Sequence, residues 1–335
     1  MKALIEIKDL TIGYHRKGNN NVVHEKMNGS LYSGELTCLL GPNGAGKSTL
    51  LRTLCGFQES LEGDVYIDGV SLKETSNEDL AKMISVVLTE KVNIQNITVK
   101  ELVSYGRSPY TGFFGRLSEK DNILIDEAIA MVGISHMKDR MVQNLSDGER
   151  QKVMIAKALV QNTPVIFLDE PAAFLDLPSK VELMQLLHKL TMETNKVIFI
   201  VTHDLDLALQ TADKIWLLAN DKPLQIGVPE DLIIRDKFKG FFEREGVYFD
   251  KRTGLFKIKN KHYRKVAVSG HGFEYTLLRR ALSRNGIEPV HNIDAEISIE
   301  IIQGEETKFV LSYKDEKREF TYIESVLYCL KDLQE

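Results

Sequence analysis

Cysteine, long apolar runs and excess positive charge are all scarce in this sequence, and each scarcity excludes a class of protein. The three cysteines, Cys38, Cys55 and Cys329, are too few and too widely spaced for a disulfide framework or a zinc site, so we expect each to be buried. No apolar run approaches the roughly 20 residues that a membrane-spanning helix needs. The 43 basic and 48 acidic residues give a net charge of −5, which argues against binding nucleic acid through bulk charge but leaves a local basic patch open.

Charged residues also come early in the chain. Lys2, Glu6 and Lys8 interrupt the apolar stretch that a secretory signal peptide requires. Together with the low cysteine content, they lead us to expect a cytosolic protein in a reducing compartment.

The order of apolar segments predicts an α/β fold with more than one domain. A length of 335 residues suggests about two domains, and no repeat occurs at the periods of solenoids or propellers. Continuous apolar strands at 165–168 and 197–201 alternate with helical patterns, which indicates parallel βαβ units covered on both faces. We also expect strands at 4–14, from Val22, at 36–40 and at 215–218, helices from Ser48 and at 147–160, 179–193 and 205–212, and a mostly helical stretch at 77–145 broken at 106–109.

A second pattern starts near Tyr263, after a charged stretch at 237–261. Within it, Gly270-His271-Gly272 follows a strand; a contact with an anion is one interpretation, and a plain turn is the one that we favour. The pattern predicts a small α+β unit with strands at 266–268, 296–302, 308–313 and 318–322 and helices at 275–285 and 324–333.

Residues 41–48 match G-x-x-x-x-G-K-[ST], the Walker A phosphate loop. Glycines let backbone N–H groups turn inward around phosphate oxygens, and the helix that follows points the positive end of its dipole at the same place. We expect Lys47 to reach the β- and γ-phosphates and the Ser48 hydroxyl to bind Mg²⁺. A chance match in a glycine-rich turn is the alternative, but the predicted strand before the loop and helix after it favour nucleotide binding. The predicted nucleotide contacts of this loop are Gly41, Pro42, Asn43, Gly44, Ala45, Gly46, Lys47, Ser48 and Thr49.

Two carboxylates follow the predicted strand at 165–168. A buried parallel strand delivers its carboxyl end to the crevice where ligands bind. We therefore expect Asp169 to hold Mg²⁺, directly or through water, and Glu170 to polarise the attacking water as general base. A solvated acidic strand end is common in proteins, but the phosphate loop earlier in the chain favours the catalytic interpretation.

Leu145-Ser146-Asp147-Gly148-Glu149 opens a helix with Ser146 as its cap. With Arg150-Gln151 after it, this segment resembles the LSGGQ signature of the ATP-binding cassette (ABC) superfamily, with Asp147 in place of the first glycine. Together with the phosphate loop and the acidic strand end, it makes the chain similar to an ABC-transporter ATPase over residues 1–236. The resemblance implies that Ser146, Gly148 and Glu149 contact the nucleotide held by a second copy of the chain.

Other positions agree with the same family. Tyr14 matches the aromatic residue that stacks on adenine, and residues 173–176 match the D-loop at the dimer interface. His203, after a buried strand, matches the switch histidine that contacts the γ-phosphate. The resemblance thus implies catalytic roles for Lys47, Glu170 and His203.

Residues 98–103 and 106–110 indicate one subgroup within the superfamily. They are similar to the helical subdomain of ATPases that serve importers of iron-siderophores, haem and cobalamin. An ordinary helix that ends before a proline-containing turn is the plain alternative.

One position departs from the family pattern. The family usually has glutamine at the end of the strand near 86–88, where it senses Mg²⁺ and the attacking water, and the alignment puts Thr89 there with Glu90 next. We favour Thr89 acting on the metal through a water, with Glu90 turned toward a membrane partner. The alternative is that Glu90 itself is the sensor.

These features predict a P-loop α/β core with an antiparallel β subdomain, a helical subdomain at about 90–150 and a C-terminal α+β domain. We expect an ATPase domain at 1–236, a linker at 237–262 and an accessory domain at 263–335. The resemblance implies an ATP-hydrolysing subunit, using ATP and Mg²⁺, of an importer for an iron-siderophore, haem or cobalamin-type ligand.

The resemblance also implies partners. They are a second copy of the chain, bound head to tail through the ATP sites, a separate membrane permease docked near 89–110, and indirectly a substrate-binding protein; nucleic acid is not among them. A peripheral position on the cytoplasmic face of the bacterial inner membrane follows. The rivals are a soluble ABC ATPase of translation or DNA repair, an importer of another substrate, and a regulator whose C-terminal domain senses a ligand. A lone Walker A loop and the lack of sustained heptads argue against the first.

Overall fold

The chain divides into two units, each with its own apolar core. The first comprises Met1–Glu243 with Phe249–Leu255, and the second Arg244–Tyr248 with Phe256–Glu335. The structure, a computed structural model, describes residues 3–16, 19–89, 95–112, 115–239, 241, 246–250, 255–291, 295–304 and 306–333. No helix in these ranges is both long and apolar enough to cross a membrane.

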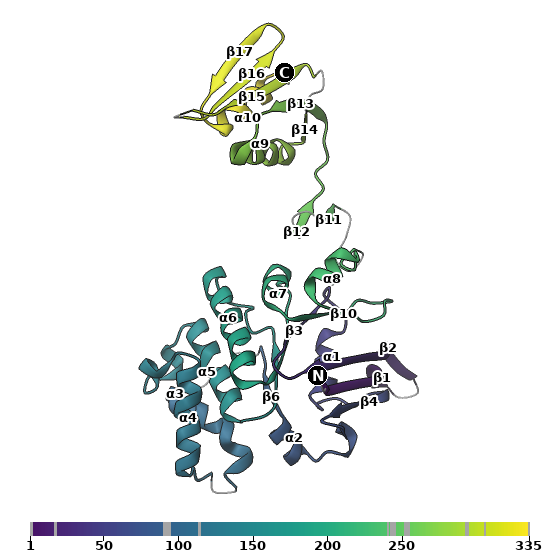
Figure 1. Cartoon of the computed structure of the whole chain (residues 1–335), viewed down its shortest axis with the longest axis vertical. Coiled ribbons are helices and arrows are strands. Elements are labelled where there is room, and N and C mark those ends of the chain that lie inside the picture. The colour runs from purple at the N-terminus through teal and green to yellow at the C-terminus, as the bar shows by residue number, and fades with distance from the viewer. Residues whose placement is uncertain are drawn as a thin grey trace. The chain divides into compact units, whose positions relative to one another are not determined.

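A six-stranded sheet organises the first unit (Figure 1). Its order is β10-β9-β3-β8-β7-β6, and every pair is parallel except β10 with β9. Parallel pairing brings the carboxyl ends of β3, β6, β7 and β8 to one edge of the sheet, where the predicted functional segments begin. The bounds are β3 Leu36–Leu40, β6 Ile84–Val87, β7 Val165–Asp169, β8 Val197–Val201, β9 Lys214–Leu217 and β10 Gln225–Gly227.

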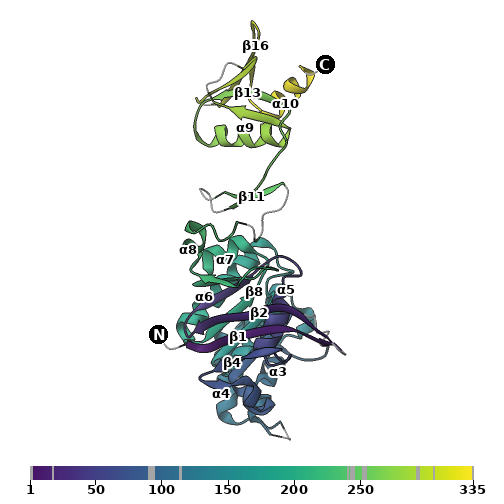
Figure 2. The same cartoon turned by 90° about the vertical axis from the view of Figure 1, so that its right-hand side faces the viewer.

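A second, antiparallel sheet has the order β2-β1-β4-β5 and faces the viewer in Figure 2. Its strands are β1 Ala3–Arg16, β2 Asn19–Tyr32, β4 Glu62–Ile67 and β5 Val70–Ser71. Ile5 and Ile7 alternate with more exposed residues, and their side chains share one buried cluster with Ile12, Leu50 and Phe167. This packing brings β1 and β2 against the helix that follows the phosphate loop.

Helices α3, α4 and α5 lie on the opposite side of the parallel sheet from β1, β2 and β4 (Figure 1). Each of the three begins at a capping box, with Thr98, Ser118 and Ser146 as the cap residues, so the free N–H groups of each first turn are satisfied locally. The helices of the unit are α1 Lys47–Leu54, α2 Asn77–Met83, α3 Val99–Ser104, α4 Glu119–Met131, α5 Asp147–Val160, α6 Leu177–Thr194, α7 Leu205–Thr211 and α8 Pro229–Ile234, with 3-10 turns at Leu72–Glu74, Tyr105–Tyr110, Ser135–Met137 and Val142–Asn144.

Arg107 joins the parts of this helical subdomain. Its Nε donates to Asp121 Oδ1 at 2.7 Å, its Nη1 donates to the Val160 carbonyl at 3.0 Å, and its guanidinium lies 3.9 Å from the centre of the Tyr110 ring. The preceding Gly106 has no room for a side chain, because a Cβ there would lie 2.2 Å from the Lys157 carbonyl oxygen. The predicted break at 106–109 is therefore a 3-10 helix that presses directly against α5.

The second unit is a five-stranded sheet of order β14-β13-β15-β16-β17 with two helices. β13 pairs in parallel with β14 and β15, while β16 and β17 continue antiparallel. Buried residues of β13, β15 and β16 share one core with the helices. The elements are β13 Arg264–Ser269, α9 Gly272–Arg284, β14 Ile287–Val290, β15 Ile297–Ile302, β16 Lys308–Tyr313, β17 Glu316–Phe320 and α10 Ile323–Asp332.

The structure adds elements that the sequence patterns did not predict. The charged segment 237–261 contains the ribbon of β11 Val247–Asp250 and β12 Leu255–Ile258. β6 interrupts the stretch whose pattern predicted mostly helix, and it is the strand that the family resemblance put near 86–88. β10, α8 and β14 were also missed; all of these elements are short, so their periodicity is weak. The expected burial of the cysteines is confirmed for all three.

Candidate functional site

The phosphate loop connects β3 to α1, as its sequence predicts. Gly44 and Gly46 adopt φ values of 78° and 83°, a left-handed conformation that glycine takes without steric cost. Gly41 passes so close to its neighbour that a Cβ would lie 2.1 Å from the Leu218 carbonyl oxygen. These glycines give the loop its tight turn, which the Ala45 N–H closes with a bond of 3.2 Å to the Pro42 carbonyl.

Lys47 is buried at the start of α1, with 6% of its surface exposed. Its Nζ donates to the carbonyls of Gly41 at 2.8 Å and Pro42 at 3.1 Å. Burial lowers the pKa of the Lys47 ammonium, while the carboxylates of Glu170 and Asp169 act to raise it. A cation held beside a glycine-rich backbone loop at the start of a helix fits an anionic ligand such as a nucleotide phosphate.

Asp169 ends β7 at the same edge of the sheet, and Glu170 follows it. Burial raises the pKa of the Asp169 carboxyl, the like charge of Glu170 adds to the rise, and His203 and Lys47 oppose it. The described residues hold no group of three or more His, Cys, Asp or Glu side chains that could bind a metal by themselves. Mg²⁺ commonly uses only one or two protein ligands and takes the rest from substrate phosphates and water, so Asp169 with the Ser48 hydroxyl fits that ion.

Glu170 and His203 form a close pair. His203 Nε2 lies 2.5 Å from Glu170 Oε1, and both side chains remain partly exposed. Glu170 itself has a φ of 45°, in the left-handed region that residues with a Cβ rarely adopt. A carboxylate at the strand end, touched by an imidazole from the loop after β8, can accept a proton from a water beside the phosphate site.

Thr89 lies beside these carboxylates. Its Oγ1 donates to the backbone carbonyl of Asp169 at 2.7 Å, across the two strands β6 and β7 that pair in register. Glu90, the alternative sensor, lies outside the described residues. Which of the two serves Mg²⁺ stays a prediction.

Tyr14 lies near the carboxyl end of β1. Its hydroxyl lies 2.9 Å from Thr49 Oγ1 on α1, and 47% of its surface is exposed. The ring is therefore tied to the phosphate-loop helix while remaining accessible, as a residue that stacks on a base requires.

The signature segment caps α5. Ser146 Oγ accepts from the Glu149 N–H at 3.2 Å, and the Glu149 carboxylate accepts from the Ser146 N–H at 2.8 Å. Glu149 also pairs with Arg140 at 3.2 Å. The Glu149 carboxylate is thus engaged in holding the helix start, which leaves Ser146 Oγ and the backbone near Gly148 as the groups that can meet an anion.

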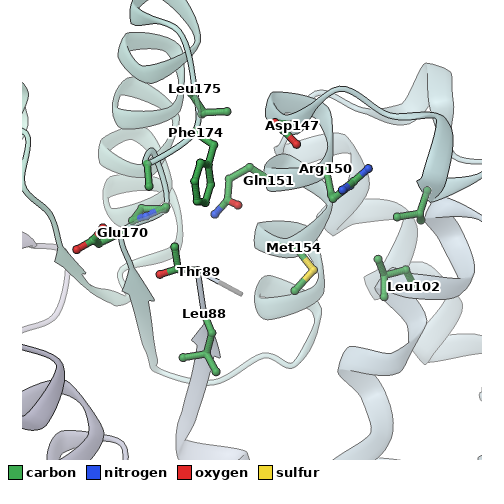
Figure 3. Close-up of a pocket in the computed structure, with 13 residues that line it drawn as sticks. Leu88, Thr89, Leu102, Asp147, Arg150, Gln151, Met154, Glu170, Phe174 and Leu175 are labelled. Atoms are coloured by element: carbon green, nitrogen blue, oxygen red, sulfur yellow. The ribbon is translucent and has the colours of Figure 1, made fainter. Parts of the chain in front are cut away.

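A pocket separates α5 from the strand ends that carry Thr89 and Glu170 (Figure 3). In Figure 3, Phe174 and Gln151 point into this space from the loop after β7 and from α5. The rest of its lining is Leu88, Leu102, Val142, Asp147, Arg150, Met154, Pro171, Ala173 and Leu175.

His24 is a residue of this region that the sequence analysis missed. It lies on β2, and its Nε2 is 2.8 Å from the carbonyl oxygen of Ala45 in the phosphate loop. A histidine inside a strand gave no signal, because its partner is 21 positions away, in the loop between β3 and α1.

Known proteins resemble both units. A profile described as ABC transporter matches residues 24–173, and one described as iron ABC transporter C-terminal domain matches residues 263–331. MJ0873 of Methanocaldococcus jannaschii, an uncharacterised ABC transporter ATP-binding protein, is 39% identical over 279 residues, which cover 82% of this chain and 95% of that protein. The chain belongs to the ATP-binding proteins of ABC transporters. The sequence-based prediction of an ABC-transporter ATPase is thereby confirmed.

Two further relatives support the family assignment. The iron(3+)-hydroxamate import ATP-binding protein FhuC of Bacillus subtilis is 35% identical, over 74% of this chain and 91% of FhuC. The dimeric structure of the ATP-binding cassette MJ0796 with ADP and phosphate bound is 27% identical, with a TM-score of 0.58, and the match covers 67% of this chain and 98% of that cassette. This likeness confirms the predicted P-loop cassette fold.

Proposed function

We propose that this ABC ATPase hydrolyses ATP to drive an importer of an iron-siderophore or a similar iron chelate. The observation that carries the proposal is the presence, in one chain, of a phosphate loop within the ABC transporter match and a C-terminal unit that matches the iron ABC transporter C-terminal domain. The name of FhuC, an iron(3+)-hydroxamate import protein, supports the iron chelate over haem or cobalamin.

In the proposed site, the amides of residues 41–49 and the Lys47 ammonium bind the β- and γ-phosphates of ATP. Ser48 and Asp169 would hold Mg²⁺, which neutralises charge on the phosphate oxygens. Thr89 keeps the Asp169 backbone in position through its hydrogen bond to the carbonyl. The accessible ring of Tyr14 is available to the adenine.

Glu170 is the proposed general base. It accepts a proton from the attacking water, while His203 orients its carboxylate and contacts the γ-phosphate. The new bond joins the water oxygen to phosphorus, and the bond to the leaving ADP oxygen breaks. The partly exposed Glu170–His203 pair leaves room for that water.

A second copy of the chain completes the site in this proposal. Ser146 and the backbone near Gly148 of one copy cap the phosphate held by the other, since the start of a helix attracts anions. The dimeric, ADP- and phosphate-bound cassette MJ0796 supports this arrangement. Glu149 takes part by fixing Ser146 rather than by touching phosphate.

The remaining partners are a membrane permease and, through it, a substrate-binding protein. The permease would dock near residues 89–110, which puts the ATPase on the cytoplasmic face of the membrane as a peripheral subunit. We keep the proposed boundaries of 1–236 for the ATPase and 263–335 for the accessory domain, with 237–262 between them.

Two experiments test the proposal. The chain should copurify with a membrane permease, and in vesicles this complex should take up a ferric siderophore when ATP is supplied. Uptake of haem or cobalamin alone would overturn the iron-chelate assignment. Lys47→Ala should abolish ATP turnover in that complex, whereas Lys152→Ala, which removes an ion pair between α5 and α6, should not. Full turnover in Lys47→Ala would exclude the proposed phosphate site.

A further inference from the structure

His24 and the phosphate loop meet at a single peptide unit, between Ala45 and Gly46. The imidazole is 7% exposed, and its Nε2 lies 2.8 Å from the Ala45 carbonyl oxygen. Because a carbonyl can only accept, Nε2 must carry the hydrogen of this bond. A strand of the antiparallel sheet thus donates a buried hydrogen bond to the backbone of the phosphate loop.

The geometry of a peptide unit turns this bond into a constraint on the neighbouring amide. In a planar trans peptide, the C=O and the N–H point in opposite directions. A hydrogen bond that holds the Ala45 carbonyl toward β2 therefore holds the Gly46 N–H away from β2, toward the interior of the loop.

Packing reinforces the same orientation. Gly46 sits at the cap of α1 with a φ of 83°, and a Cβ there would lie 2.5 Å from Val23 Cγ1 and 3.3 Å from His24 Cδ2. Val23 and His24 of β2 thus occupy the space next to Gly46. The 45–46 peptide is held by contact on one side and by a hydrogen bond on its carbonyl.

We infer that His24 is a positioning residue for nucleotide binding, which keeps the Gly46 N–H directed at the phosphates. This inference rests on the proposed phosphate site. The alternative role is that of a buried histidine that only fills space between β2 and α1. The two roles differ in one respect, because positioning needs the N–H donor and filling needs only the volume.

Substitutions at His24 separate donor from volume. His24→Leu keeps apolar volume and removes the donor, while the Nε2 amide of His24→Gln can reach about as far as the imidazole. We expect His24→Leu to weaken binding of both MgADP and MgATP by about tenfold, because one hydrogen bond to a charged group is lost or misaligned. His24→Gln should stay within about threefold of the wild type, and the kcat of the assembled transporter at saturating ATP should change little in either variant.

A matched control is Thr53→Val. Thr53 is 2% exposed on α1 and donates to the Thr49 carbonyl, so this change also removes a buried hydrogen bond, from the helix that follows the phosphate loop. It should lower the melting temperature without the loss of affinity. If His24→Leu does not fold, His24→Met, which is more flexible, takes its place in the comparison.

The measurement is calorimetric titration of the full-length chain with MgADP and MgATP, alongside thermal unfolding without nucleotide. Equal affinities in the wild type and His24→Leu would overturn the inference, as would a loss in His24→Gln as large as that in His24→Leu. If the wild type itself binds neither nucleotide, the proposed function fails instead. Tight binding by the wild type and His24→Gln with weak binding by His24→Leu supports the inference.

Discussion

His203 Nε2 and Glu170 Oε1 lie 2.5 Å apart, although the two residues follow different strands of the parallel sheet. The pair joins the carboxyl ends of β7 and β8, which are neighbours in register. Each residue therefore limits where the other can point. A change at Glu170 should affect the chemistry at this edge while leaving the phosphate-binding loop intact.

Replacing Glu170 by Gln should separate binding from hydrolysis. The amide keeps the size of the side chain but cannot take a proton from water, so we expect ATP hydrolysis to fall by a factor on the order of 100 or more. MgATP should then accumulate in a stable dimer, detectable as an earlier peak in size-exclusion chromatography. Glu182→Gln, an exposed change on α6, is the control and should hydrolyse normally. A monomeric elution of Glu170→Gln with MgATP would contradict the proposed role.

Thr89 and Glu90 make different predictions for Mg²⁺. Thr89→Ala removes the hydrogen bond to the Asp169 carbonyl, so we expect the apparent Mg²⁺ affinity of the ATPase to fall by several-fold, with recovery in Thr89→Ser. The assay is ATP hydrolysis by the assembled transporter over a range of Mg²⁺ concentrations. Loss of both hydrolysis and Mg²⁺ affinity in Glu90→Ala, with neither altered in Thr89→Ala, would show that Glu90 is the sensor.

The buried pair of Arg107 and Asp121 should make the helical subdomain sensitive to acid. Hydrogen bonds from the Ser118 hydroxyl and backbone, followed by that from Arg107, lower the pKa of Asp121 to about 2. A depressed carboxyl pKa stabilises the fold above the unfolded value of about 3.9, and this contribution is lost as the pH falls toward 2.

Asp121→Asn tests that prediction. At neutral pH the substitution should lower the free energy of unfolding by about 2–3 kcal/mol, because it leaves the Arg107 charge buried without its partner. In urea titrations the difference from the wild type should shrink between pH 4 and pH 2. Asp126→Asn, whose exposed carboxylate pairs with Lys100, should cost far less at any pH. An undiminished difference at low pH would show that Asp121 acts without its charge.

Truncation after Lys261 should leave a folded ATPase. The cut removes the second unit's core but keeps Phe249, whose ring stacks on Phe238 of the first unit with centroids 5.4 Å apart. The shortened chain should bind MgATP with the affinity of the full chain in calorimetry. A longer truncation after Asp236 would remove both phenylalanines and should lower the melting temperature. Aggregation of the first truncation would mean that the units share a core.

The sequence predicts the parts of this protein whose chemistry is local. The phosphate loop, the acidic end of β7 and the cap of α5 each lie within a few consecutive residues, so their patterns identify them directly. β3 and β7, which lead into the first two, are almost entirely buried because both faces of the parallel sheet are covered. Short strands such as β10 and β14 were not predicted because three or four residues carry little periodicity.

Contacts between distant segments could not be predicted in the same way. His24 reaches Ala45 only because β2 folds over α1, and Thr89 reaches Asp169 only because β6 and β7 are adjacent in register. Neither side chain carries a pattern that reveals its partner. Positioning residues of this kind become visible only when the sheet order is known.

The left-handed backbone of Glu170 gives the protein an evolutionary liability. A residue with a Cβ in that conformation costs roughly 1–2 kcal/mol relative to one without, so glycine would suit the turn better than glutamate does. Selection for heat resistance alone would therefore favour replacement of the very residue that we expect to activate water. The ATPase keeps its turnover only while selection for the proposed transport function outweighs this gain in stability.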